Sequence, residues 1–145
     1  GASNVAIGSS AMQVNTTGAN NIAIGQAALD ANTTGGDAGG SVAIGSGALG
    51  AQTTASNNLA IGQASAGAIT TGVSNIGIGN WALDALTTGT WNVAMGQNAL
   101  TGMTTSSYNT AIGSGAMAAC TTINMVTAFV LNSFNSSISS NFICS

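Results

Sequence analysis

The sequence predicts an all-β fold, a parallel β-solenoid or β-roll made of 17-residue coils, and two observations carry this prediction. The phrase Asn-Val-Ala-Ile-Gly, first seen at residues 4–8, recurs along the chain, and a pair of Thr residues follows each closing glycine by eight and nine residues. The closing glycines are 17 residues apart, with one gap of 20: Gly8, Gly25, Gly45, Gly62, Gly79, Gly96 and Gly113. A short fixed period indicates units that bury their apolar faces only by stacking on their neighbours.

Two regions follow from this spacing. Residues 1–122 form the predicted repeat domain of seven regular coils, and a glycine-rich insert at residues 35–40 accounts for the longer gap. Residues 123–145 keep the register of the repeat although its glycine is lost, so we expect a degenerate eighth coil or a C-terminal cap. Solenoids need atypical terminal repeats. The residues expected to close the open end of the core are Phe129, Phe134 and Phe142.

Each coil is expected to hold two short strands, because Gly and β-branched residues recur at fixed places and no helical apolar stripe is sustained. Side chains alternate between two faces along a strand. In the first strand we place the large aliphatic residues, such as Val5 and Ile7, inside the coil and the central Ala6 outside. In the second strand, the first Thr of each pair is assigned to a buried, hydrogen-bonded ladder and the second Thr to the surface.

Two sets of residues are predicted to contact other subunits. The first is the central position of the first strand, which is small and never polar, as expected for a sheet covered on both faces. The second is an apolar strip in the C-terminal half of the rod, of the kind that marks interfaces. The first set is Ala6, Ala23, Ala43, Ala60, Gly77, Ala94 and Ala111. The second set is Ile69, Leu86, Met103, Trp91, Tyr108 and Met125. Packing of aromatic residues between neighbouring coils is the alternative interpretation of the strip.

The composition excludes several classes of function. The chain has no Lys, Arg, His, Glu or Pro, its ionisable side-chain carboxyls are those of Asp30, Asp37 and Asp84, and its net charge is −3. Catalysis usually needs a positioned acid, base or activated nucleophile, and nucleic-acid binding depends on Lys and Arg. We therefore expect neither an enzyme nor a nucleic-acid-binding protein, and no cofactor or metal site.

Membrane insertion is not expected either. The most apolar run, residues 123–131, is nine residues long, whereas a spanning helix needs about 20 apolar residues. Cys120 and Cys144 permit one disulfide but do not demand it. The composition as a whole favours an extracellular location.

The phrase Ser41-Val42-Ala43-Ile44-Gly45 and its equivalents in all seven coils resemble the head repeats of trimeric autotransporter adhesins. The longer unit with Thr-Thr-Gly resembles repeats of bacteriophage tail fibres. The resemblance covers about residues 1–122. It implies a β-roll or β-solenoid that assembles as a trimer, is displayed outside a cell or virion and serves attachment. The chain departs from the adhesin pattern in having no basic residues.

Three functions are compatible with the sequence. The leading one is a non-enzymatic extracellular fibre or filament subunit that self-associates, as a homotrimer or head to tail, with surface attachment as a candidate task. The second is an adhesin module that binds a cell-surface glycan or receptor by stacking on Trp81, Trp91 and Tyr108. The third is an ice-binding solenoid that uses the outward Thr of each pair. Such a surface needs two parallel Thr columns, whereas we expect the neighbouring outward column to hold Asn, Gln, Ile, Leu, Met and Cys.

Overall fold

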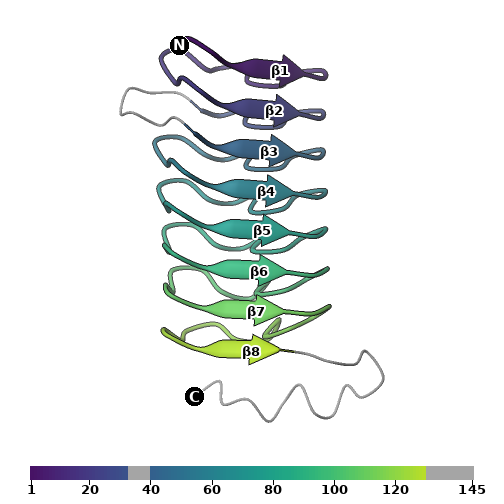
Figure 1. The fold of residues 1–145 in the computed structure, drawn as a ribbon, viewed down its shortest axis with the longest axis vertical. Helices are drawn as coiled ribbons and strands as arrows, with labels where there is room; N and C mark the ends of the chain where they lie inside the picture. The colour runs from purple at the N-terminus through teal and green to yellow at the C-terminus, as the bar shows by residue number, and fades with distance from the viewer. Residues whose placement is uncertain (33–39, 130–145) are drawn as a thin grey trace.

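The structure, a computed structural model, describes residues 1–32 and 40–129. In this part of the chain eight parallel strands stack in chain order into one sheet, with one strand in each coil (Figure 1). The strands are β1 (Val5–Ile7), β2 (Ile22–Ile24), β3 (Val42–Ile44), β4 (Leu59–Ile61), β5 (Ile76–Ile78), β6 (Val93–Met95), β7 (Thr110–Ile112) and β8 (Thr127–Phe129). Each residue opposes its equivalent in the next coil, as Ala43 opposes Ala60. The predicted β-solenoid is confirmed, and β8 continues its register into the eighth coil.

The expectation of two strands per coil is wrong for the described residues. Where the second strand was predicted, the chain returns through turns in which the backbone φ is positive, for example 53° at Ala27 and 51° at Leu29. An extended strand excludes such values. Neighbouring coils are nevertheless hydrogen-bonded there, since the backbone N–H of Leu29 donates to the Ala48 carbonyl at 3.0 Å and that of Leu83 to the Ala99 carbonyl at 3.0 Å.

The first strand faces the opposite way from the prediction. Its central residue points into the coil and is buried from the second coil onward, whereas the large residues on either side of it are partly exposed. The buried central residues are Ala23, Ala43, Ala60, Gly77, Ala94, Ala111 and Ala128. The Ala column therefore cannot contact another subunit, and its one exposed member, Ala6, lies in the first coil.

The narrow interior explains this orientation. A column of large side chains on the turns, which includes Leu49, Leu83 and Leu100, is fully buried opposite the sheet and leaves room for little more than a methyl group at the strand centre. Where Gly77 replaces the central Ala, an added Cβ would lie 2.7 Å from the Ser65 Oγ. That hydroxyl donates to the Gly77 carbonyl at 2.9 Å. A Val or Ile side chain does not fit in such a space, so the large residues point outward.

Part of the predicted apolar strip also lies in the core. Ile69, Leu86 and Met103 are fully buried between the sheet and the turns, so the prediction that they form an interface is wrong. Asn32 and Gln52, which hold the same position in earlier coils, are buried as well. This column is therefore interior along the rod, polar near the N-terminus and apolar towards the C-terminus.

A ladder of asparagines forms the polar part of the core. The Asn58 Oδ1 accepts hydrogen bonds from the backbone N–H and the side-chain amide of Asn75, at 2.8 and 3.2 Å. Asn75 accepts from Asn92 in the same way, at 3.0 and 3.1 Å, and its own amide donates to the Gly89 carbonyl at 2.9 Å. Buried amides need such partners. The ladder continues to Asn109 and thus fixes one coil on the next at the start of β4, β5, β6 and β7.

Ser41 takes the place of one asparagine in this ladder, and Gln52 compensates for its shorter side chain. The Ser41 Oγ accepts from the Gln52 amide at 3.1 Å and from the Asn58 backbone N–H at 3.3 Å. The Gln52 Oε1 in turn accepts from the Asn58 amide at 3.1 Å. All three side chains are buried. The longer Gln side chain therefore restores the hydrogen bond that a serine cannot reach.

Of the residues predicted to close the C-terminal end of the core or to form a disulfide, the structure describes Phe129 and Cys120. Phe129 occupies the outward position of its strand and is exposed, so it does not close the core as predicted. Phe134, Phe142 and Cys144 lie outside the described residues. Cys120 is buried and disulfide-bonded, and Cys144 is the other cysteine of the chain.

Exchanging the sizes of two neighbouring residues tests the orientation of the strand. Ala94→Val should lower the free energy of unfolding of the single chain by about 1–3 kcal/mol, because it overpacks the interior. Val93→Ala, which changes an outward residue, should lower it by less than about 1 kcal/mol. Urea unfolding at low protein concentration measures both values. The reverse order of the two effects would contradict the orientation.

Buried Asn32 provides a second test, because neither polar atom of its side chain has a hydrogen-bond partner in the described part of the chain. Asn32→Leu should raise the free energy of unfolding by about 1–3 kcal/mol, since it removes an unsatisfied buried amide. The matched variant Asn75→Leu breaks the ladder and should lower it by about 2 kcal/mol or more. A loss of stability in both variants, measured by urea unfolding, would show that Asn32 has a partner.

Candidate interaction surface

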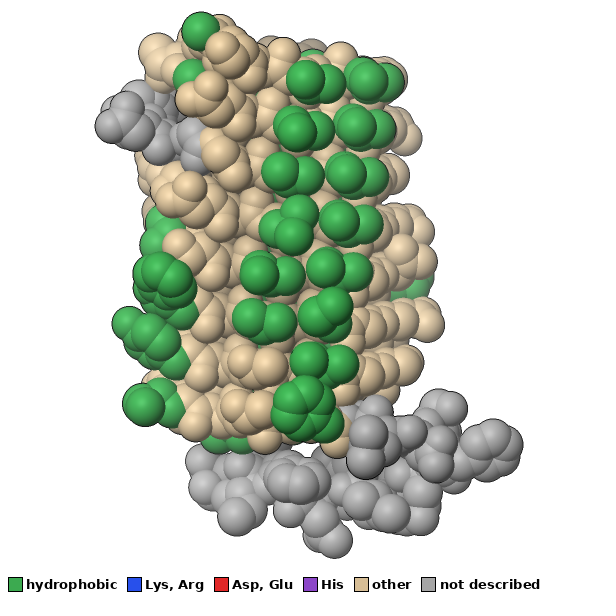
Figure 2. Space-filling model, viewed as in Figure 1, with side chains coloured by type: hydrophobic (Ala, Val, Ile, Leu, Met, Phe, Trp, Pro, Cys, Tyr) green, Lys and Arg blue, Asp and Glu red, His purple; other side chains and the backbone are tan. Residues whose placement is uncertain are grey.

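The most distinctive surface of the rod is the outer side of its sheet. Two side-by-side columns of large apolar side chains run along it (Figure 2), and we call them the aliphatic face. The columns are Val5, Ile22, Val42, Leu59, Ile76 and Val93, followed by Thr110 and Thr127, and Ile7, Ile24, Ile44, Ile61, Ile78, Met95, Ile112 and Phe129. The repeat aligns these side chains because each strand pairs with the next in register.

The aliphatic face is long and uncharged. Parallel strands lie about 4.8 Å apart, so eight strands give an apolar strip about 34 Å long. Its side chains are partly or largely exposed in every strand. Scattered exposed aliphatic residues need no explanation, but a continuous apolar strip marks a contact surface. Sequence reasoning missed this surface because it placed the same residues inside the coil.

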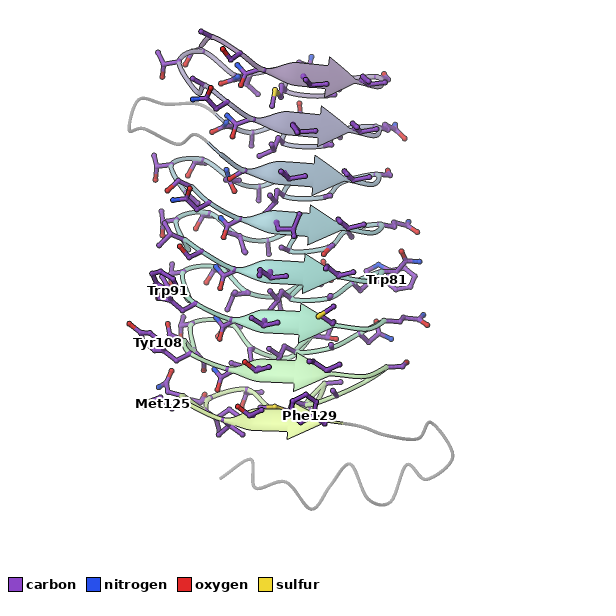
Figure 3. The ribbon with its side chains drawn as sticks, viewed as in Figure 1. Trp81, Trp91, Tyr108, Met125 and Phe129 are labelled. Carbon is purple, nitrogen blue, oxygen red and sulfur yellow. The ribbon has the colours of Figure 1, made fainter. Side chains whose placement is uncertain are left out.

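Aromatic residues flank the aliphatic face in the C-terminal half of the rod (Figure 3). Trp91 and Tyr108 stand at the corner that precedes the strand, where they are 57 and 59 % exposed, and Met125 continues this row. Trp81 stands at the opposite corner, after β5. The structure therefore places this half of the predicted strip on the surface and available for contact.

These aromatic residues occupy an unfavourable backbone conformation. The φ angles of Trp81, Trp91 and Tyr108 are 57°, 59° and 63°. Such angles suit Gly, Asn and Asp, whereas in a bulky residue they are outliers. Asn20 and Asn57 hold the position of Trp91 in earlier coils, with φ angles of 60° and 58°. The repeat thus has a residue suited to this corner and replaces it with an aromatic one.

The Thr pairs form a different surface from the one predicted. The hydroxyls of Thr53, Thr70 and Thr87 donate to backbone carbonyls in the next coil at 3.1, 3.2 and 2.9 Å, so a hydrogen-bonded ladder is present. None of these three side chains is buried. These Thr residues and the second Thr of each of these pairs lie at bends and not on a strand. The neighbouring column that was expected to point outward, which includes Ile69, is interior.

The few acidic residues are dispersed. Asp30 and Asp84 hold the same position three coils apart, and Asp37 lies outside the described residues. Burial raises the pKa of the Asp84 carboxyl. Within residues 1–32 and 40–129, His, Cys, Asp and Glu side chains form no group of three that could hold a metal ion. The same residues include no helix of the length and apolar character needed to cross a membrane.

Comparisons with protein-family models, with curated proteins and with solved structures found no match to this chain. The fold itself defines the class of the molecule, which is a parallel β-solenoid repeat protein.

Proposed function

We propose that this chain is the subunit of an extracellular structural fibre and that copies of it assemble through the aliphatic face. The observation that carries the proposal is the pair of outward apolar columns on the sheet, one continuous along β1–β8 and the other along β1–β6. Removing apolar surface from water contributes roughly 25 cal/mol per Å², and association must also overcome the loss of rotational and translational freedom. A strip that runs the length of the rod favours rods lying side by side.

A cyclic trimer suits the dimensions of this face. A strand of three residues is about 10 Å long, and this length is the width of the aliphatic face. Three such faces around one axis would enclose a narrow core of Val, Ile and Leu side chains. The resemblance to trimeric adhesin heads and tail fibres points to the same assembly. The head-to-tail filament is the alternative, and it would leave the aliphatic face in water.

The extracellular location rests on two observations. Cys120 is disulfide-bonded, and disulfides persist mainly in oxidising compartments. The chain also has no Lys or Arg, so trypsin has no site to cut, which suits a protein displayed outside a cell or virion. Surface attachment is the task that we propose for the fibre.

Two other functions are less well supported. Trp91 and Tyr108 are exposed next to hydroxyl-bearing Thr90 and Ser107, which would suit an uncharged glycan, and glycan-array binding that Trp91→Ala abolishes would favour an adhesin. Ice binding would use a flat array of Thr residues, whereas the described pairs at 53–54, 70–71 and 87–88 lie at bends and the outer side of the sheet is mainly aliphatic. Thermal hysteresis of the purified protein would favour that function instead.

A charge placed on the aliphatic face tests the proposed assembly. Ile61→Asp and Ile78→Asp should shift the protein from a discrete oligomer to the monomer, because desolvating several like charges around one axis is unfavourable. The matched controls Thr54→Asp and Thr71→Asp, at exposed bends away from the sheet, should leave the oligomer intact. Sedimentation velocity measures the mass, and circular dichroism checks that the coil persists.

Salt should have little effect on this oligomer, because a chain without basic residues forms no side-chain ion pairs that ions can screen. A wild-type protein that sediments as a monomer at every accessible concentration would contradict the proposal. The interior residues Leu86 and Met103 are unsuitable for this test, since a charge there would disrupt the coil itself.

A further inference from the structure

Two tryptophans mark opposite edges of the aliphatic face. Trp81 follows β5 and Trp91 precedes β6, and the two rings stand at nearly the same height along the rod (Figure 3). Trp91 is 57 % exposed and Trp81 is 36 % exposed. The chain holds no other tryptophan. Both large apolar rings therefore reach into solvent at the level of the same coil.

The backbone at both tryptophans is unfavourable for such a residue, with φ angles of 57° and 59°. Positive φ brings the Cβ too close to the backbone, which Gly, Asn and Asp tolerate best. Asn98 occupies the position of Trp81 in the next coil, with φ 58°, and Asn57 occupies that of Trp91 two coils earlier, also with φ 58°. The coil imposes this φ on every residue at these corners, as on Ala64 at 52° and on Ser74 at 58°, so a bulky side chain placed there is strained. Burial within the single chain does not offset this strain, because both rings remain exposed.

The proposed assembly brings these two edges together. When three rods surround an axis parallel to their length, each edge of one aliphatic face meets the opposite edge of the next copy, because the interfaces of a ring of three are heterologous and join two different surface patches. The Trp91 edge of one copy then meets the Trp81 edge of its neighbour. Because both rings lie at the same height, copies without an axial shift place them in contact.

We propose that Trp91 of one copy packs against Trp81 of the next and that this contact fixes the rods parallel and in axial register. The inference rests on the proposed function, which supplies the aliphatic face as the contact but does not set the register. A uniform apolar face permits sliding by whole coils, since every coil presents nearly the same residues. One bulky pair, present in a single coil, removes that ambiguity.

The corresponding positions in the other coils are consistent with this arrangement. One coil after the Trp pair, Tyr108 would face Asn98 of the next copy, and one coil before it, Ser74 would face Ala64. An antiparallel pair of rods would instead bring like edges together with their heights reversed. Trp81 and Trp91 would then never meet, and both would stay exposed.

Disulfide trapping tests the contact directly. The double variant Trp81→Cys with Trp91→Cys should oxidise to a closed covalent ring whose chain number equals that of the oligomer, seen by non-reducing gel electrophoresis and intact mass. The register control pairs Trp81→Cys with Asn57→Cys, a position two coils or about 9.6 Å from Trp91. A disulfide cannot bridge that offset, so the control should remain uncrosslinked, as should the wild-type protein.

A second experiment separates an interface role from a role within the coil. Trp91→Asn and Trp81→Asn introduce the residue that suits positive φ, so each should raise the thermal unfolding temperature of the dilute monomer. Each should also weaken assembly by about tenfold or more in dissociation constant, as expected for loss of an aromatic pair. Tryptophans that merely pack within their own coil would give the opposite result, a lower unfolding temperature with unchanged assembly.

The outcomes distinguish this inference from the proposed function. If the wild-type protein is an oligomer but the tryptophan pair does not crosslink, or the register control crosslinks equally well, the tryptophan contact is wrong and the aliphatic interface stands. Loss of glycan binding in Trp91→Asn, with assembly unchanged, would assign the ring to a ligand and also overturn the contact. A monomeric wild-type protein would overturn both proposals.

Discussion

The narrow interior of the 17-residue coil determines most of what is distinctive about this molecule. The sheet and the turns enclose one large side chain per coil from the turns, such as Leu49 or Leu83, together with the column that contains Ile69 and Leu86. Only a small residue fits opposite them at the strand centre. The two remaining side chains of each strand must therefore face outward. The thin core and the aliphatic face are consequences of the same constraint.

Hydrogen bonds between neighbouring coils add to the stabilisation that apolar packing in the thin core provides. The ladder of Asn58, Asn75 and Asn92 binds each coil to the next through side-chain and backbone groups. Backbone hydrogen bonds join the turns in the same direction, as from Leu83 to Ala99. A single coil cannot make these bonds alone, so stability accumulates as coils are added, as in other repeat proteins. The outward apolar columns contribute little to the isolated chain and become useful only against another surface.

The period of the sequence predicted the solenoid, the place of the first strand and the continuation of the register into β8. It did not predict which side of the strand faces inward, because alternation separates two faces without saying which is buried. The usual assumption that large residues lie inside fails when the coil is narrower than two aliphatic side chains. The signal that was available is the asparagine that precedes six of the eight strands, such as Asn92 before β6, since a polar residue that recurs at one position of the repeat indicates a ladder.

The second strand was wrongly predicted for a similar reason. Leu29 and Leu83 are not residues that ordinarily adopt positive φ, so their conformation cannot be read from their identity. Gly47 and Gly115, which replace Ala27 in other coils, are the local hint of a turn. The surface half of the predicted strip, Trp91 and Tyr108, lies outside because this corner of the coil faces solvent whatever residue holds it, as it does at Asn20 and Asn57. The other half of the strip, Ile69, Leu86 and Met103, lies in the core. The sequence pattern does not distinguish these interior residues from the exposed aromatic ones, because it does not say in which direction the side chains of the turns point.

Methyl-resolved NMR with a soluble paramagnetic agent tests the central claim, that the strand hides its small residue and presents its large ones. In the dilute single chain, the account predicts strong relaxation of the Ile44 and Ile61 δ1-methyl groups and almost none for the Ala43 and Ala60 methyl groups. In the assembled protein the isoleucine methyl groups should become protected as well. Isoleucine methyl groups that are protected at every concentration, with alanine methyl groups that respond, would contradict both the orientation of the strand and the surface built on it.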